Sequence, residues 1–118
     1  MSEIELPQSK SDLSDDELRL SLNNETGKLS WDELARHFAR GVVIKVANSV
    51  DLVEVALKFA RDDRQAVEVW LTSGEVAKAT DEDALHWHQN NATFWAVVSA
   101  PFVLVQEISA EQENASTH

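Results

Sequence analysis

Residues 42–71, VVIKVANSVDLVEVALKFARDDRQAVEVWL, decide the fold of this chain. The β-branched run at 42–46 predicts a short strand, because branched side chains suit a pleated surface. A helix is expected at about 50–61, capped by Ser49. Its apolar residues cover most of its circumference, which predicts a central, mostly buried position. Asp62-Asp63 then ends this helix and caps the next one. This order of elements indicates a mixed α/β domain.

The segments before residue 42 predict two more helices. Ser14-Asp15-Asp16-Glu17 and Ser30-Trp31-Asp32-Glu33 are capping boxes, in which the serine hydroxyl and the glutamate carboxylate each accept a hydrogen bond from a backbone amide. The first helix is short and fades near Gly27. The second has apolar residues at a helical spacing and ends at Gly41, where a left-handed residue is favoured.

The segments after the helix capped by Asp62-Asp63 predict two strands with a helix between them. That capped helix should bury a face formed by Val67, Trp70 and Leu71. Residues 76–79 form the next strand, and Thr80-Asp81-Glu82-Asp83 begins a short helix with acids where the helix dipole favours them. The apolar run at 93–107 predicts a final strand covered on both faces for part of its length, in which Pro101 marks a bulge, a bend or an edge.

The predicted fold is therefore α/β (α+β), with a small three-stranded sheet packed against four to five helices. From Trp31 onward the element order is similar to that of a winged helix, with residues 80–92 as a helical insert in place of the wing loop. One domain is expected at 13–108. The polar segments 1–12 and 109–118 are expected to be disordered tails.

Composition limits the function further. The 118 residues contain no cysteine, which excludes disulfides and thiolate sites. The net charge is −11. It is concentrated at the ends: residues 1–33 hold nine acidic and three basic side chains, residues 80–118 hold six acidic and none basic, and the middle is nearly neutral. With neither a signal peptide nor a membrane-spanning run, we expect a soluble, cytoplasmic, acidic protein without membrane partners.

Several segments together resemble a small bacterial family named for its domain of unknown function 2288. The segments that carry the resemblance are Asp51-Leu52-Val53-Glu54-Val55-Ala56, Asp62-Asp63 with Val67 and Trp70, Val76-Ala77-Lys78, Ala96-Val97-Val98 and Pro101-Phe102-Val103-Leu104-Val105. They span roughly residues 18–107. The resemblance implies a bacterial cytoplasmic protein, and it brings no activity, cofactor or site residue with it.

Two groups of residues could carry metal or acid–base chemistry, and both have a structural explanation. On a helix His86 and His88 point in nearly opposite directions and cannot share a metal ion, whereas on a strand they would share a face. The metal hypothesis, with Glu82 or His37 as a further ligand, is disfavoured because this segment is predicted to be helical. Asp62-Asp63 and Asp81-Glu82-Asp83 stand where helices begin, and capping accounts for them. An enzyme would need Asp62 or Asp63 paired with a histidine in one pocket. No cofactor, metal or catalytic residue is predicted.

Two binding hypotheses follow. The leading one is a non-enzymatic protein-interaction or accessory module that binds a partner or itself through an exposed aromatic patch at Phe94, Trp95 and Phe102. The alternative is a divergent winged-helix DNA-binding protein, which requires a continuous positive face. That face would consist of Arg36, Arg40, Lys58, Arg61 and Arg64. Nucleic acid is the less favoured partner, because the groove-facing residues (Arg64, Gln65, Glu68, Thr72) carry one cation and one anion and the flanks are acidic.

Overall fold

The computed structural model describes residues 12–108, which fold into five helices and one five-stranded mixed sheet. The elements in chain order are α1 (Asp15–Glu25), β1 (Gly27–Ser30), α2 (Trp31–Ala39), β2 (Val43–Val46), α3 (Leu52–Ala60), α4 (Arg64–Ser73), β3 (Val76–Lys78), α5 (Asp81–Gln89), β4 (Thr93–Ser99) and β5 (Phe102–Glu107). The mixed α/β class is confirmed. Apart from Asp12, the predicted tails lie outside the described residues.

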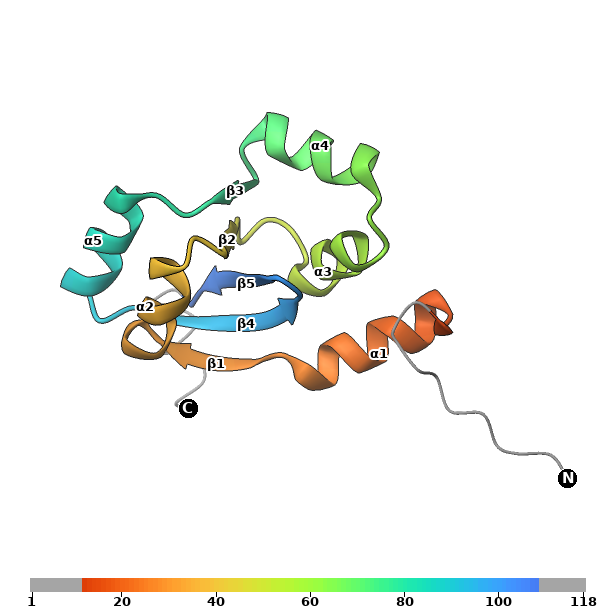
Figure 1. Cartoon of the computed structure of the whole chain (residues 1–118), viewed down its shortest axis with the longest axis horizontal. Helices are drawn as coiled ribbons and strands as arrows, with labels where there is room; N and C mark the ends of the chain where they lie inside the picture. Colours follow the sequence, from red (N-terminus) through yellow and green to blue (C-terminus); the bar gives the residue numbers. More distant parts are fainter. Residues whose placement is uncertain (1–11, 109–118) are drawn as a thin grey trace, which may run out of the picture.

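The strands lie in the order β1-β4-β5-β2-β3 (Figure 1). β2 and β5 are parallel, and every other neighbouring pair is antiparallel. Because β2 and β5 run in the same direction, their carboxyl ends, Val46 and Glu107, lie at the same end of the sheet along the strand direction. The polar cleft described below lies at this end of the sheet.

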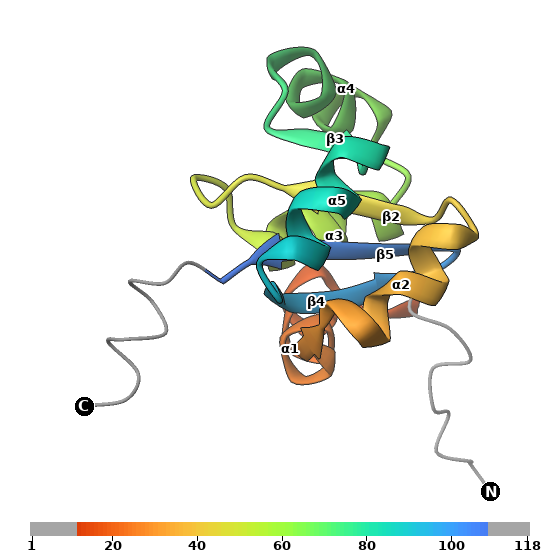
Figure 2. The same ribbon diagram turned by 90° about the vertical axis from the view of Figure 1, so that its left-hand side faces the viewer.

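Helices cover both faces of the sheet. α2 and α5 lie in front of the strands in Figure 2, and α3 lies behind them. On the α3 side, Leu57 packs with Val97 and Leu104, and on the α2 and α5 side, Phe94 packs with Leu34 and Trp87. The alternation of buried side chains along β4 and β5 between these two cores shows that the apolar run at 93–107 is covered on both faces for part of its length, with Trp95 and Val98 exposed.

The predicted caps account for most helix starts. Ser14, Ser30 and Thr80 each accept a hydrogen bond from the third amide of their helix, and each helix returns a carboxylate to the cap amide. Asp63 caps α4 as expected. The prediction for Ser49 was wrong, because Asp51 caps α3 through the amides of Val53 and Glu54.

The sheet has two more strands than the sequence predicted. β1 pairs with β4 and occupies the four residues from Gly27 through the cap at Ser30, where no strand was predicted. The run at 93–107 is a hairpin rather than one strand, because the chain turns at Ala100-Pro101 and β5 returns against β4. Pro101 therefore lies in the turn, where no ladder donor is needed.

The resemblance to a winged helix ends at β3. A wing would join β3 to a neighbouring strand of the sheet. β3 is instead an edge strand that pairs with β2, and α5 follows it. Among the described residues, no helix is both long and apolar enough to cross a bilayer.

Candidate functional site

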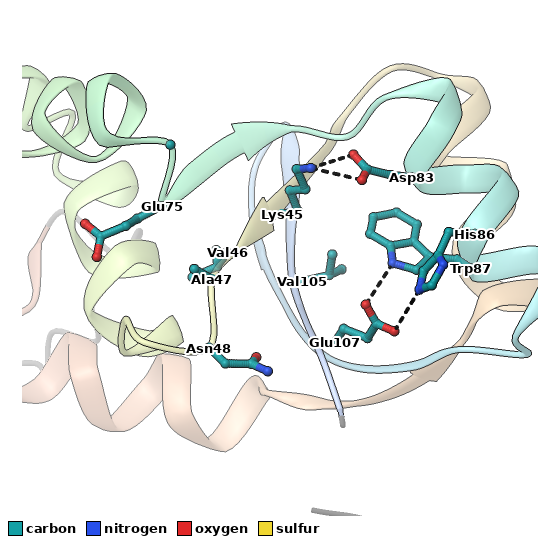
Figure 3. A pocket seen from close by; sticks show the side chains of 11 residues that line it. Lys45, Val46, Ala47, Asn48, Glu75, Asp83, His86, Trp87, Val105 and Glu107 are labelled. Carbon is teal, nitrogen blue, oxygen red and sulfur yellow. Dashed lines mark hydrogen bonds and ion pairs between the residues drawn. The ribbon is translucent and has the colours of Figure 1, made fainter. Parts of the chain in front are cut away.

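A polar cleft opens where the parallel strands β2 and β5 end (Figure 3). Its volume is about 320 Å³, near the lower limit for small-molecule sites. Val46 and Val105 contribute apolar wall, and α5 closes one side. The polar groups come from all the surrounding elements. They are Lys45, Asn48, Glu75, Asp83, His86 and Glu107.

Lys45 and Asp83 form an ion pair at one end of the cleft. The ammonium of Lys45 lies 2.9 Å from Oδ1 and 2.8 Å from Oδ2 of Asp83, so both carboxylate oxygens contact it. Partial burial opposes ionisation of Asp83, but hydrogen bonds from Lys45 and Thr80 outweigh it, and the pKa of Asp83 is lowered. Asp83 therefore has two roles, since it also accepts the Thr80 amide at 2.9 Å in the helix cap.

A second hydrogen-bonded group lies at the other end. The indole Nε1–H of Trp87 donates to Oε1 of Glu107 at 3.2 Å, and Nε2 of His86 lies 4.0 Å from Oε2 of Glu107. The amide Nδ2 of Asn90 donates to the backbone oxygen of His86 at 2.7 Å and lies 3.2 Å from His86 Nδ1. In the tautomer whose Nδ1 accepts from this amide, the ring proton is on Nε2, on the side of Glu107.

The titratable side chains of the cleft that form ion pairs do so with one another. A catalytic histidine needs a ring nitrogen directed at the substrate, but both nitrogens of His86 face protein groups. The side chains that line the cleft include no hydroxyl or thiol nucleophile. Lys45 is held by Asp83 and so is not a free amine.

A second concave surface, called here the α4 groove, lies between α4, the end of α3 and the β4–β5 turn. It encloses about 520 Å³. Its apolar lining comes from side chains that are distant in sequence but adjacent in the fold: Phe59, Val67, Leu71, Pro101 and Phe102. The ring of Phe102 contacts that of Phe59 edge-on, with centroids 5.8 Å apart.

Helix α4 is the least embedded helix among the described residues. None of its side chains is fully buried, although Trp70 packs on the α3 core. The sequence placed Leu71 on the buried face, and this was wrong, because Leu71 is 50% exposed at the rim of the groove. Val69 is also exposed. The helix therefore presents apolar surface that no other described element covers.

The family model described as "Protein of unknown function (DUF2288)" matches residues 17–107. The chain belongs to the DUF2288 family. The NMR solution structure of PA1075 from Pseudomonas aeruginosa is similar, with 37% sequence identity and a TM-score of 0.72 over 89% of this chain and 96% of that one. A comparison with curated proteins gives no match. The resemblance expected from the sequence is confirmed, and every residue that lines the cleft or the α4 groove lies inside the range matched to the DUF2288 family.

The aromatic residues predicted as an interaction patch do not lie together in this DUF2288 fold. Phe94 is 0% exposed and packs edge-on against Trp87, with ring centroids 4.9 Å apart. Trp95 points to the opposite face of the sheet, where the ammonium of Lys28 lies 5.3 Å from its ring. Phe102 is at the far end of the hairpin, in the α4 groove. Strand alternation separates Phe94 from Trp95, so only Phe102 lies in a candidate site.

The five cations predicted as a basic face also fall into separate groups. Arg36 and Arg40 belong to α2, on one side of the sheet, while Lys58, Arg61 and Arg64 lie near the α3–α4 turn on the other side. Each cation of the second group contacts a carboxylate. The pairs are Lys58–Asp63 at 3.7 Å, Arg61–Asp15 at 3.1 Å and Arg64–Asp62 at 3.7 Å. No continuous positive face results.

The metal and acid–base hypotheses gain no supporting geometry. No group of three metal-binding side chains occurs within residues 12–108. Asp62 and Asp63 line the α4 groove, whereas His86 lines the cleft, so the structure does not bring these aspartates into a pocket with that histidine. Asp63 accepts the amide of Ala66 in the cap of α4, as its position in sequence predicted.

Sequence reasoning did not identify the residues of the cleft as a group. Lys45 and Asp83 are 38 positions apart, and only the β2–β5 pairing brings Glu107 near them. One signal was available: Lys45 interrupts an otherwise apolar β2, and a charged residue in a central strand requires a partner. The five-residue run 42–46 contains that single charge.

Proposed function

We propose that this protein is a non-enzymatic accessory module of the bacterial cytoplasm that binds a partner protein through the α4 groove. The observation that supports this most directly is the exposed side chain of Leu71 above an apolar groove formed by Phe59 and Phe102. Concave apolar surfaces with exposed aliphatic rims are typical of sites that receive a side chain from a partner.

The charges of the groove indicate which partner it suits. Lys58 pairs with Asp63 and Arg64 pairs with Asp62, so these four charges are largely cancelled. Glu68 also lines the groove, which leaves it slightly acidic in a protein of net charge −11. Like charge disfavours a second copy of the chain. A partner segment with an apolar anchor beside a lysine or arginine fits both the apolar lining and Glu68.

The same charges weigh against DNA as the partner. The outward residues of α4 expected to enter a groove of DNA are exposed, but they comprise one cation, one anion and two neutral side chains: Arg64, Glu68, Gln65 and Thr72. A DNA-binding surface gathers cations that replace the counterions of the phosphates. A winged-helix DNA-binding role therefore remains the alternative with less support.

The proposal is tested by selecting short random peptides on the immobilised protein from a display library. We expect enrichment of peptides that carry a large apolar residue next to lysine or arginine. Their affinity should fall at least about tenfold for Leu71→Asp, because an apolar anchor would then face a carboxylate. Leu85→Asp is the matched control, since Leu85 is 58% exposed and lies on α5, away from the groove.

Three results would contradict the proposal. One is the enrichment of acidic peptides. Another is equal loss of binding in Leu71→Asp and Leu85→Asp, which would place the binding surface elsewhere. The third is self-association, seen by analytical ultracentrifugation as a dimer that Leu71→Asp dissociates, which would make a second copy the occupant.

A further inference from the structure

We infer that the polar cleft at the carboxyl ends of β2 and β5 binds a small organic cation with a primary ammonium group. This inference is independent of the α4 groove and would stand if the groove had no partner. The cleft has the position that ligand sites occupy beside parallel strands, just beyond the carboxyl ends of two neighbours.

The charge balance of the cleft selects a cation. Lys45 and Asp83 neutralise each other through two short contacts. Glu107 accepts from the neutral indole of Trp87, and the one ion-pair contact found for it among the described residues is His86, at 4.0 Å. The indole carries no charge, so its hydrogen bond leaves the charge of the Glu107 carboxylate available to a ligand cation.

Figure 3 shows how a ligand would lie. Glu107 points up into the cleft toward the edge of Trp87, and Val105 lies behind the space between Glu107 and Lys45. The carboxylate of Glu75 points away from Glu107, and the hydroxyl of Ser73 donates to it at 3.0 Å. An ammonium group would therefore bind Glu107, while a short alkyl body covers Val105.

The size and ligand set of the cleft weigh against two other occupants, a folded partner and a divalent metal ion. A volume of about 320 Å³ admits a compact molecule but not a folded partner. A divalent metal needs several oxygen or nitrogen ligands directed at one point, and no such group of three exists in the described part of the chain. A primary ammonium needs one carboxylate, which Glu107 supplies, and Asn48 adds a neutral amide to the lining of the cleft.

The test is an NMR titration of the ¹⁵N-labelled full chain with n-butylammonium, and separately with butyrate and 1-butanol. The reporter is the indole N–H resonance of Trp87, because this group donates directly to Glu107. We expect a saturable shift with n-butylammonium and no such shift with butyrate. Equal response to 1-butanol, or no response to n-butylammonium, would overturn the inference.

Glu107→Gln separates the carboxylate from the shape of the cleft. The amide oxygen still accepts from Trp87, so the fold is retained, but the charge is lost. We expect n-butylammonium to bind roughly tenfold more weakly, as for loss of a charge-assisted hydrogen bond.

The control is Glu82→Gln, which removes the same charge from an exposed position of α5 outside the cleft. It should alter affinity by less than about twofold, since exposed charges are screened by salt. Equal weakening in both variants would mean that only the overall negative charge attracts the cation, and would refute the site.

Discussion

The ion pair of Lys45 with Asp83 should stabilise the fold measurably more than a surface ion pair does. The side chain of Asp83 is 21% exposed and that of Lys45 39%, and the ammonium contacts both carboxylate oxygens. Exposed ion pairs contribute about 0.2–1 kcal/mol, and hydrogen bonds to charged groups about 1.5–3 kcal/mol. Since one partner is largely buried and the other screened by solvent, we expect a coupling free energy of about 1.5 kcal/mol.

The coupling is measured by a double-mutant cycle of Lys45→Met, Asp83→Asn and the double variant in urea unfolding. Asparagine keeps an oxygen that can accept the Thr80 amide, so the helix cap is retained and the cycle isolates the charge pair. Lys45→Met keeps the alkyl stem against the strand. A coupling below about 0.3 kcal/mol, the value typical of exposed helical pairs, would refute the reasoning.

Three further perturbations test the same fold. The pKa of Asp83 is lowered in the folded state, so the ionised carboxylate stabilises the fold fully above the ordinary aspartate pKa of about 3.9 and loses this effect as the pH falls through the lower folded pKa. The urea midpoint should therefore fall less steeply from neutral to acid pH in Asp83→Asn than in the natural sequence, and equal slopes would contradict this. Gln106→Ala should lower the free energy of unfolding in urea by about 2 kcal/mol, because the side-chain amide donates to the backbone oxygens of Ala47 at 2.8 Å and Val50 at 2.7 Å and so holds the loop before α3. The control Gln89→Ala, at an exposed site, should lower it by less than about 0.5 kcal/mol, and similar losses in both variants would contradict the assignment. Thr80→Ala should lower the stability measured by thermal melting by about 1 kcal/mol, because the cap of α5 is lost. Thr80→Ser should restore most of that stability, and a failure of serine to do so would mean that the threonine methyl group, not the hydroxyl, is responsible.

Local signals in the sequence predicted the helices well. The starts of α1, α2, α4 and α5 followed from short-range hydrogen-bonding patterns that lie within four consecutive residues, such as the box at Ser30 and Glu33. Such a cap is formed by neighbours in sequence, so tertiary contacts hardly alter it. The error at α3, where Asp51 rather than Ser49 is the cap, arose because two residues with capping side chains stand close together.

The sheet was predicted less completely, because strand pairing depends on distant residues. β1 is four residues long and has a single large apolar side chain, Leu29, which is too little for a pattern to predict a strand. It is a strand because β4, more than 60 residues later, supplies its hydrogen-bond partners. The hairpin of β4 and β5 was read as one strand because the turn holds only Ala100 and Pro101 between two apolar runs. The parallel pairing of β2 with β5 had no local signal at all.

The same limit explains why the candidate sites were found only in part. Phe102 was singled out for the aromatic patch and Lys58 and Arg64 for the basic face, and the fold brings all three into one groove. Asp83 was assigned to capping, which is correct but incomplete, because its contact with Lys45 arises only when β3 pairs with β2 and α5 follows it. A residue with both a local and a distant role shows only the local one in sequence.

Strand β5 connects the two sites and also keeps them apart. It begins at Phe102 in the α4 groove and ends at Glu107 in the cleft, which at about 3.3 Å per residue places the two sites roughly 17 Å apart. β5 is central, hydrogen-bonded to β4 on one side and β2 on the other, so it is a rigid spacer rather than a hinge. Perturbations this far apart with no shared partner are usually additive. A variant at Leu71 should therefore leave the response of Trp87 to n-butylammonium intact, and Glu107→Gln should leave peptide selection by the groove intact.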